Sequence, residues 1–396
     1  MKVLYVANST NASGGDNKSL LTLLHGVSSK GVTPIVVVPD KGGIYRELVK
    51  EGFDVTIVNY RMDVYPNTSS IKDIFLFVPR LLCRRIIEHA AVAKISRLCM
   101  EKGVDIVHSN VSVLSCGQSA ARKNGLPHVA HVREFVDKDF RLHPYPCKRA
   151  FYARLNSAHS YVICITRGIQ EHHGFSGVNV VQIYNGISAD CGRVTSDAVT
   201  CCEERYFLYA GRIERSKGVM QLVEAYADFI RKNPCGYTLK LAGGESDHAY
   251  AADVHLFIKS CGLDDKVQFL GARRDVASLM RNAQALVVPS VFEAFGRCLP
   301  EAMANACLTI GHDTGGTKEQ YDNGLRECGR EIGLRYRTTE ELSECLSRVY
   351  SAKDGEFDDV KDCARHVVEK LYSPKAYVDG VCAFYNKILE NENMKI

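Results

Sequence analysis

Lys2-Val-Leu-Tyr-Val-Ala7, followed by the polar stretch 8–17 and then by apolar residues at helical spacing over 20–27, decides the fold of the first half. The apolar run predicts a short buried strand, and the spacing after the loop predicts an amphipathic helix. The alternation continues, with further strands expected at 35–38, 55–58, 106–107, 129–132, 161–165 and 180–183. Short hydrophobic strands alternating with helices indicate a parallel sheet covered on both faces.

The second half repeats this pattern. Phe207-Leu-Tyr-Ala210 predicts a strand, a helix follows from Val219, and later strands are expected at 239–242, 267–270, 285–288 and 308–310. Residues 188–204 are small and polar without periodicity, which is typical of a linker. We therefore expect an α/β protein of two doubly wound Rossmann-like domains facing across a cleft. The domains are expected over 1–190 and 205–375, with a helix over 376–396 that packs back on the first domain.

The composition is that of a globular protein, because 46% of the 396 residues are hydrophobic and 24% are charged. No apolar run reaches the roughly 18 residues of a membrane span, and the first is too short for a secretory signal, so a cytoplasmic protein is expected. The first 190 residues carry 23 Lys and Arg against 15 Asp and Glu, which favours an anionic partner. These cations lack aromatic interleaving, so no nucleic-acid partner is expected.

One candidate site is Gly211-Arg-Ile-Glu-Arg-Ser-Lys-Gly218, which leaves a strand and enters a helix. Free amides and the helix dipole favour a phosphate at such a place. Arg212 and Lys217 add a planar fork and a point charge, which suit a diphosphate. A solvated basic loop is the alternative.

A second candidate is a pair of carboxylates eight residues apart. Glu293 is expected in the loop after the strand 285–288, and Glu301 in the first turns of the next helix. Ionised carboxylates only accept hydrogen bonds, so the hydroxyls of a sugar or ribose are suitable partners. A loop acid and a helix-dipole partner without a ligand are the alternative.

These motifs together resemble one family. The segment E-A-F-G-R-C-L-P-E-A-M-A around the carboxylates, the preceding A-G-R-I-E-R-S-K-G and the following Gly315-Gly316-Thr317 are similar to the retaining glycosyltransferases of family four, with the GT-B fold. The resemblance implies that Arg212 and Lys217 hold the diphosphate of a donor and Glu301 its ribose. It assigns the hydroxyls of the transferred sugar to Glu293 and the backbone of Phe295 and Gly296.

The resemblance is looser in the first half. It implies that Gly15 lies near the donor phosphate and Gly14 on the acceptor side, in the first loop between strand and helix. His131, in His131-Val-Arg133-Glu134 just past a strand, is similar to the family histidine beside the transferred sugar, and it is preferred to His108. Arg133 is assigned to the acceptor side. An ordinary turn and a structural histidine are the alternatives.

Asp137-Lys-Asp139 spells the D-x-D with which metal-dependent transferases of the other major fold hold a nucleotide-bound cation. We interpret the match as accidental, since Arg212 and Lys217 supply the charge that a metal would. Neither a metal nor a cofactor is expected.

The resemblance implies retaining transfer of a hexose-type sugar from a nucleoside diphosphate sugar, with a UDP-sugar favoured. The implied acceptor is a lipid-linked glycan in polysaccharide or glycoconjugate synthesis. A nucleotide-sugar epimerase on the same fold and a non-catalytic two-lobed ligand-binding protein are the alternatives.

A basic helical stretch bears on the acceptor. The cations that interrupt its apolar pattern are Arg80, Arg84, Arg85, Lys94 and Arg97. They predict peripheral contact with the inner face of an anionic membrane. A core-packing helix with a solvated basic face is the alternative.

Overall fold

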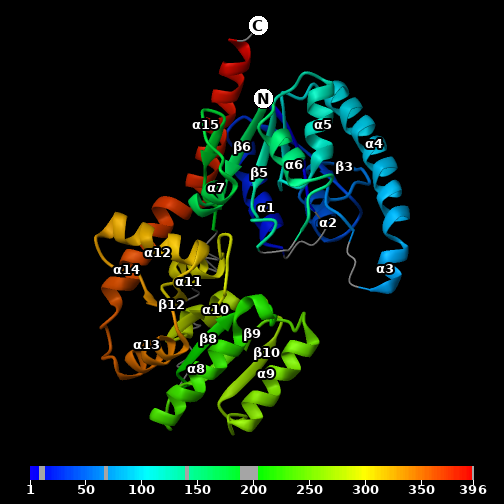
Figure 1. Cartoon of the computed structure of the whole chain (residues 1–396). Helices are drawn as coiled ribbons and strands as arrows, with labels where there is room; N and C mark the ends of the chain where they lie inside the picture. The colour runs from blue at the N-terminus through cyan, green and yellow to red at the C-terminus, as the bar shows by residue number, and fades with distance from the viewer. Residues whose placement is uncertain (9–13, 67–69, 139–141, 188–203, 395–396) are drawn as a thin grey trace. The chain divides into compact units, whose positions relative to one another are not determined.

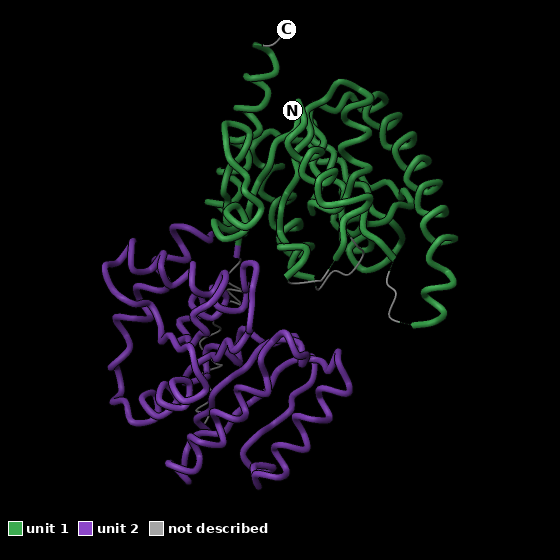
Figure 2. Tube along the Cα trace, in the orientation of Figure 1, with its two compact units in different colours: residues 1–186, 374–396 green, residues 187–373 purple. Residues whose placement is uncertain are grey.

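The computed structural model describes residues 1–8, 14–66, 70–138, 142–187 and 204–394. The chain divides into two compact units, unit 1 with Met1–Gly186 and Pro374–Ile396, and unit 2 with Ile187–Ser373 (Figure 2). The expected linker, apart from Glu204, lies outside the described residues. The last helix begins at Pro374, two residues before its expected start.

Unit 1 contains a parallel sheet with the strand order β3-β2-β1-β4-β5-β6-β7 in the described residues. Its strands are β1 (Lys2–Val6), β2 (Thr33–Val38), β3 (Asp54–Ile57), β4 (Ile106–Ser109), β5 (His128–Val132), β6 (Ser160–Cys164) and β7 (Val180–Gln182). Its helices are α1 (Gly15–Ser28), α2 (Gly43–Lys50), α3 (Ile71–Phe75), α4 (Phe77–Lys102), α5 (Ser115–Lys123), α6 (Lys148–Leu155), α7 (Arg167–His173) and α15 (Pro374–Asn393). The strand order reverses between β1 and β4, and ligands bind at the carboxyl ends of the strands beside such a reversal.

Helix α15 completes the core of unit 1. Its side chains Tyr377, Val381 and Tyr385 are buried with those of α1 and β1 in one hydrophobic cluster. The two helices approach closely, because a Cβ atom added at Gly26 of α1 would lie 2.2 Å from Cγ2 of Val378. The last segment of the chain is therefore part of the first domain (Figure 1).

Unit 2 repeats the architecture, with the strand order β10-β9-β8-β11-β12-β13 in the described residues. Its strands are β8 (Tyr206–Ala210), β9 (Thr238–Ala242), β10 (Val267–Gly271), β11 (Ala285–Val288), β12 (Thr309–His312) and β13 (Leu334–Tyr336). Its helices are η1 (Arg215–Lys217), α8 (Val219–Lys232), α9 (His248–Ser260), α10 (Val276–Asn282), α11 (Cys298–Ala304), α12 (Gly315–Cys328), α13 (Thr339–Ser351), α14 (Asp358–Val367) and η2 (Val368–Tyr372). Here the order reverses between β8 and β11.

Both sheets are parallel throughout their described pairs. The predicted class, an α/β protein of two Rossmann-like domains, is confirmed. Among the helices that the structure describes, none is both long and apolar enough to cross a membrane.

Candidate functional site

The two cations of the first candidate segment lie beyond the carboxyl end of β8 in unit 2. Lys217 ends the short helix η1, and its Nζ donates to Oε1 of Glu293 at 2.6 Å. Arg212 is more exposed, and its Nη1 lies 2.9 Å from Oε2 of Glu214. The structure thus brings Lys217 together with Glu293, and pairs Arg212 with a carboxylate of its own loop.

Glu293 sets the electrostatics of this pair. Burial by itself would lower the pKa of Lys217, but the Glu293 carboxylate outweighs it, and the net pKa of Lys217 is raised. Ser290 Oγ donates to the same carboxylate oxygen at 2.8 Å. Lys217 is therefore held as a fixed, charged ammonium group, which is what stabilisation of a phosphate requires.

The loops that follow β8 and β11, the two strands between which the strand order reverses, meet at Gly218. Its φ of +67° lies in the left-handed region, and an added Cβ would lie 1.9 Å from the carbonyl oxygen of Pro289. Only glycine tolerates both conditions. This close approach places η1 against the loop that carries Glu293.

The loop between β11 and α11 positions the predicted sugar-binding backbone. Gly316 N, at the start of α12, donates to the carbonyl oxygen of Glu293 at 2.8 Å. Phe295 is buried, and Gly296 has a φ of +75°. Glu301 lies in the first turn of α11, where its Oε1 accepts from Arg297 Nε at 3.2 Å. Glu293 and Glu301 are placed as expected, one in the loop and one on the helix.

In unit 1 His131 lies within β5, so the expectation that this histidine follows the strand is wrong. The structure also brings both candidate histidines together. His108 lies on β4, and β4 pairs with β5, which carries His131. The distance from His108 Nε2 to His131 Nδ1 is 3.2 Å, and both side chains are completely buried. Burial, reinforced by Arg133, lowers the pKa of both rings well below the usual value, so both are neutral.

Arg133 determines where the protons of these rings lie. Its Nη2 is 3.2 Å from His131 Nδ1, and an arginine can only donate. His131 Nδ1 is then an acceptor, and the neutral ring carries its proton on Nε2. His108 then donates from its Nε2, which leaves its Nδ1 to accept. The Tyr385 hydroxyl lies 2.5 Å from this Nδ1 and 3.2 Å from the Tyr5 hydroxyl, and we assign its single proton to the shorter contact.

This proton order leaves one donor available. His131 Nε2 is buried, and no described group is its hydrogen-bond partner. A buried N–H without a partner costs free energy, so such a group is suited to a ligand atom that accepts.

Arg133 also links this histidine to the first loop. Its Nε donates to the backbone carbonyl of Asn110 at 2.9 Å, and Asn110 Nδ2 donates to the carbonyl of Asp16 at 3.3 Å. Gly15 begins α1 and Gly14 precedes it, so Gly14, Gly15, His131 and Arg133 share the carboxyl edge of the sheet. The structure brings the first-half candidates together.

The D-x-D segment is only half described, because Asp139 lies outside the described residues. Asp137 accepts from Lys148 Nζ and from His172 Nε2, each at 2.9 Å. Burial opposes ionisation of Asp137, but these two partners lower its pKa to about 2. Over the ranges that the structure describes, no three His, Cys, Asp or Glu side chains gather as metal ligands.

Sequence reasoning missed the residues that support these candidates. Tyr377 and Tyr385 lie on α15, and the Tyr377 hydroxyl accepts from Arg133 Nη2 at 2.9 Å. Asn110 directly follows β4, which is a signal that the sequence does contain. The two tyrosines are distant in sequence, and only the return of α15 to unit 1 brings them to the site.

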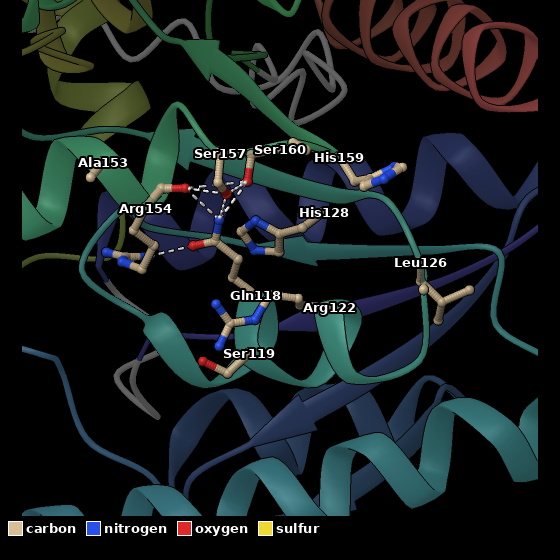
Figure 3. Close-up of a pocket in the computed structure, with 12 residues that line it drawn as sticks. Gln118, Ser119, Arg122, Leu126, His128, Ala153, Arg154, Ser157, His159 and Ser160 are labelled. Atoms are coloured by element: carbon tan, nitrogen blue, oxygen red, sulfur yellow. Dashed lines mark hydrogen bonds between the residues drawn. The ribbon is translucent and has the colours of Figure 1, made fainter. Parts of the chain in front are cut away.

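A separate polar hollow of about 380 Å³ lies at the amino ends of β5 and β6 (Figure 3). Gln118 points toward Ser157 and Ser160, and its Nε2 donates to the Arg154 carbonyl at 2.6 Å (Figure 3). The residues lining this hollow include none of the predicted site residues. We interpret its hydrogen bonds as a structural link between α5 and α6.

Two family models match the chain. One, described as Glycosyltransferase Family 4, matches residues 13–190, and one described as Glycosyl transferases group 1 matches residues 202–333. Together they span most of both units. The chain belongs to the family-four glycosyltransferases. This glycosyltransferase has the GT-B fold of two Rossmann-like domains, as the sequence motifs indicated.

Curated relatives of this glycosyltransferase are moderately similar. An uncharacterised glycosyltransferase of Methanocaldococcus jannaschii, MJ1178, is 26% identical over 74% of this chain and 82% of its own length. The Bacillus subtilis glycosyltransferase YqgM is 25% identical over 47% of this chain, and the match spans 50% of that protein.

Solved structures support the fold of the glycosyltransferase. Anabaena Alr3699/HepE, crystallised with UDP, has a TM-score of 0.78 and 18% identity, with 98% of this chain and 100% of that chain covered.

Proposed function

We propose that this glycosyltransferase moves a hexose-type sugar from a nucleoside diphosphate sugar, with UDP as the expected nucleotide, to a glycan acceptor with retention of configuration. The observation that carries the proposal is the Lys217–Glu293 pair, at 2.6 Å, beside the reversal of strand order in unit 2. It combines a cation for phosphate with a carboxylate for hydroxyls. The Anabaena structure with UDP supports the choice of nucleotide.

The donor diphosphate is proposed to bind the β8–α8 loop. Lys217 supplies a fixed positive charge, and Arg212, 59% exposed at its side chain, is able to turn from Glu214 toward a phosphate. Glu301 accepts from the ribose hydroxyls. As the bond to the sugar breaks, negative charge develops on the leaving diphosphate, and Lys217 and Arg212 stabilise it without a metal or cofactor.

The transferred sugar is proposed to lie against Glu293, the backbone of Phe295 and Gly296, and His131. Because the His131 ring is neutral and protonated on Nε2, it donates a hydrogen bond to a sugar hydroxyl oxygen. Gly15 lies near the donor phosphate, while Gly14 and Arg133 bound the acceptor side.

Retention is proposed to follow from substitution on one face of the sugar. The acceptor hydroxyl attacks the anomeric carbon on the side from which the diphosphate leaves, through an oxocarbenium-like transition state. A leaving phosphate oxygen takes the hydroxyl proton, so no protein nucleophile is needed. Catalysis then rests on orientation and on electrostatic stabilisation of the departing charge.

The acceptor is proposed to be lipid-linked, which places the enzyme on the cytoplasmic face of an anionic membrane. The cations of the first half support this, since they favour an anionic surface.

The test is release of nucleoside diphosphate from a panel of labelled nucleotide sugars, with and without glycolipid acceptors. Acceptor-dependent release with an α-configured product from an α-configured donor is expected. Interconversion of the donor without acceptor would instead identify an epimerase, and binding without turnover a ligand-binding protein.

Metal independence has its own test. Activity is expected to persist in excess EDTA, since side chains and helix N-termini replace the metal charge. Loss of activity that magnesium or manganese restores would contradict it.

A further inference from the structure

Large exposed apolar side chains gather along α3 and the first half of α4 in unit 1. Their exposed fractions lie between 60% and 79%, and they are Ile71, Ile74, Phe75, Val78, Leu82 and Ile86. Spacings of three and four residues place the members of each helix on one side of it. We call this surface the α3–α4 face. Large apolar side chains that are gathered on one surface, rather than scattered singly, indicate an interaction site.

The residues around the α3–α4 face are basic. Residues 71–86 contain four Lys and Arg against one Asp. Lys72, Arg85 and Arg97 are exposed, whereas Arg84 is half-buried and Arg80 pairs with Asp73 at 2.6 Å. Arg84 is therefore less available for the expected membrane contact than the exposed Arg85 and Arg97.

A hollow of about 1100 Å³ adjoins the α3–α4 face between α4 and α5. Ile86 belongs to both the face and the wall of the hollow. The cations that line it are Arg85, Arg122, Lys123 and Arg154, and the carboxylates are Asp63 and Glu88. Ser115 donates to Glu88, so one carboxylate already has a partner. The cations are in excess, and the hollow suits a phosphate group.

The α3–α4 face lies at the functional edge of the sheet. Helix α4 joins β3 to the parallel strand β4, so it runs back from the carboxyl edge of the sheet to the amino edge. Its first half is therefore at the edge that carries Gly15 and Arg133, and α3 continues it there (Figure 1).

We propose that the α3–α4 face docks on a bilayer containing anionic phospholipids, with its apolar side chains in the interface and lipid phosphates at the hollow. Bulky apolar residues flanked by Lys and Arg are the pattern of helices that lie in a membrane interface. A second copy of the chain is a poorer occupant, because it would bring like charges together. The inference deepens the proposed lipid-linked acceptor by naming the surface that meets the lipid, but its test needs no turnover.

The chain contains no tryptophan, which makes a sharp test possible. Phe75→Trp introduces a single fluorophore on the α3–α4 face, and Leu256→Trp introduces one at another exposed position, on α9 of unit 2. With phosphatidylcholine vesicles containing phosphatidylglycerol, the emission of the Phe75→Trp protein is expected to shift to the blue. The emission of the Leu256→Trp protein should stay unchanged, and pure phosphatidylcholine should have little effect on either.

Co-sedimentation then separates the apolar from the charged contribution. Phe75→Ser with Leu82→Ser is expected to lower partitioning at least tenfold, and Val178→Ser with Leu256→Ser is the matched control. Each cation near an anionic surface is worth about a fivefold change. Arg85→Glu with Lys123→Glu should therefore also lower partitioning at least tenfold, whereas Lys259→Glu on α9 should not.

Three results would overturn the docking surface. They are absence of binding to anionic vesicles at low salt, an equal loss in the control variants, and a dimer in sedimentation that Phe75→Ser dissociates. The last would reassign the face to a second copy. Turnover of a water-soluble acceptor by a protein that binds vesicles would refute the lipid-linked acceptor and leave the surface standing.

Discussion

Lys217 is the side chain on which the proposed donor chemistry depends most. We expect Lys217→Ala to lower kcat by about 100-fold or more, since it removes one charge that stabilises the leaving diphosphate. Arg212→Ala should act in the same direction. Lys232→Ala, at the far end of the following helix α8, is the control for loss of a lysine in unit 2. Initial rates at saturating donor measure the effect, and wild-type turnover in Lys217→Ala would remove the diphosphate role.

Glu293 and Glu301 are expected to have separable roles. Glu301→Ala should weaken nucleoside diphosphate binding about tenfold, because a hydrogen-bonded ribose loses its acceptor. Glu293→Ala should spare that affinity and impair transfer, because its partners are Lys217 and the transferred sugar. Calorimetry with the nucleoside diphosphate decides between them. Equal losses of affinity would contradict the division.

Tyr385 is expected to act on His131 through His108. Tyr385→Phe removes the donor to His108 Nδ1, so His108 is free to carry its proton there and to present a second acceptor to His131 Nδ1. The repulsion should displace the His131 ring and lower kcat about tenfold, the scale of losing a group that orients a functional one. Nitrogen-15 NMR of the ring nitrogens reports the change of tautomer directly.

Tyr226→Phe removes a buried hydroxyl from unit 2, and it is the control for losing a buried tyrosine hydroxyl away from His108. Unchanged ring nitrogen signals in Tyr385→Phe would refute the proton order, whatever happens to the rate.

At the scale of elements, Gly218 in the turn between η1 and α8 can be compared with Gly262 after α9, which has nearly the same φ and serves as the control. Gly218→Ala would place a Cβ 1.9 Å from the Pro289 carbonyl, whereas Gly262, with a φ of +66°, has open space around it. Both substitutions force alanine into the left-handed region, at about 1 kcal/mol. We expect Gly218→Ala to lose several kcal/mol more and to weaken donor binding. Equal losses of unfolding free energy would contradict the close approach.

The sequence predicted the strands well, because parallel strands are short continuous apolar runs between polar loops. The strand expected at 161–165 and the observed β6 differ by one residue at each end. The strand expected at 129–132 contains His131, so placing this residue just past a strand disagreed with the apolar pattern itself. The sequence motifs favoured His131 over His108 as the site histidine, although the pairing of their strands brings the two rings within hydrogen-bond distance.

Helix α4 shows what the pattern could not predict. Its apolar spacing indicated a helix correctly, but spacing tells which residues share a side and not what covers that side. Ala91, Ile95 and Leu98 are buried in unit 1, while Leu82 and Ile86 of the same helix are exposed. The contacts of α15 with the site were equally hidden, since they depend on chain topology.

For the whole molecule, buried histidines predict loss of stability in mild acid. Burial lowers the pKa of His108, His128 and His131, that of His128 to about 3. In the unfolded chain histidine titrates near 6.5, so below that pH the unfolded state binds protons that the folded state does not. Stability present above about pH 6.5 is therefore lost as the pH falls, by about 1 kcal/mol per pH unit for each histidine.

One carboxyl opposes this trend. Burial raises the pKa of Asp63 to about 6, so the folded state binds its proton first and gains stability as the pH falls further. Burial also lowers the pKa of His173, so four histidines outweigh one carboxyl, and a net loss is expected in urea unfolding between about pH 7 and pH 5.5. His128→Gln should reduce the slope whatever it does to stability at neutral pH. A flat profile would contradict the neutral histidines.

Unit 1 is built from two segments that precede and follow unit 2 in the sequence, and this order has a consequence for synthesis and for recombination. Ribosomes deliver residues 187–373 as one uninterrupted block, so unit 2 can fold while unit 1 still awaits α15 and the tyrosine that orders His108. A gene fusion that exchanges this block between homologues would transplant the proposed donor half as a cassette. A block extended beyond Pro374 would instead carry part of α15 with it and separate that part from the helix α1 against which it packs.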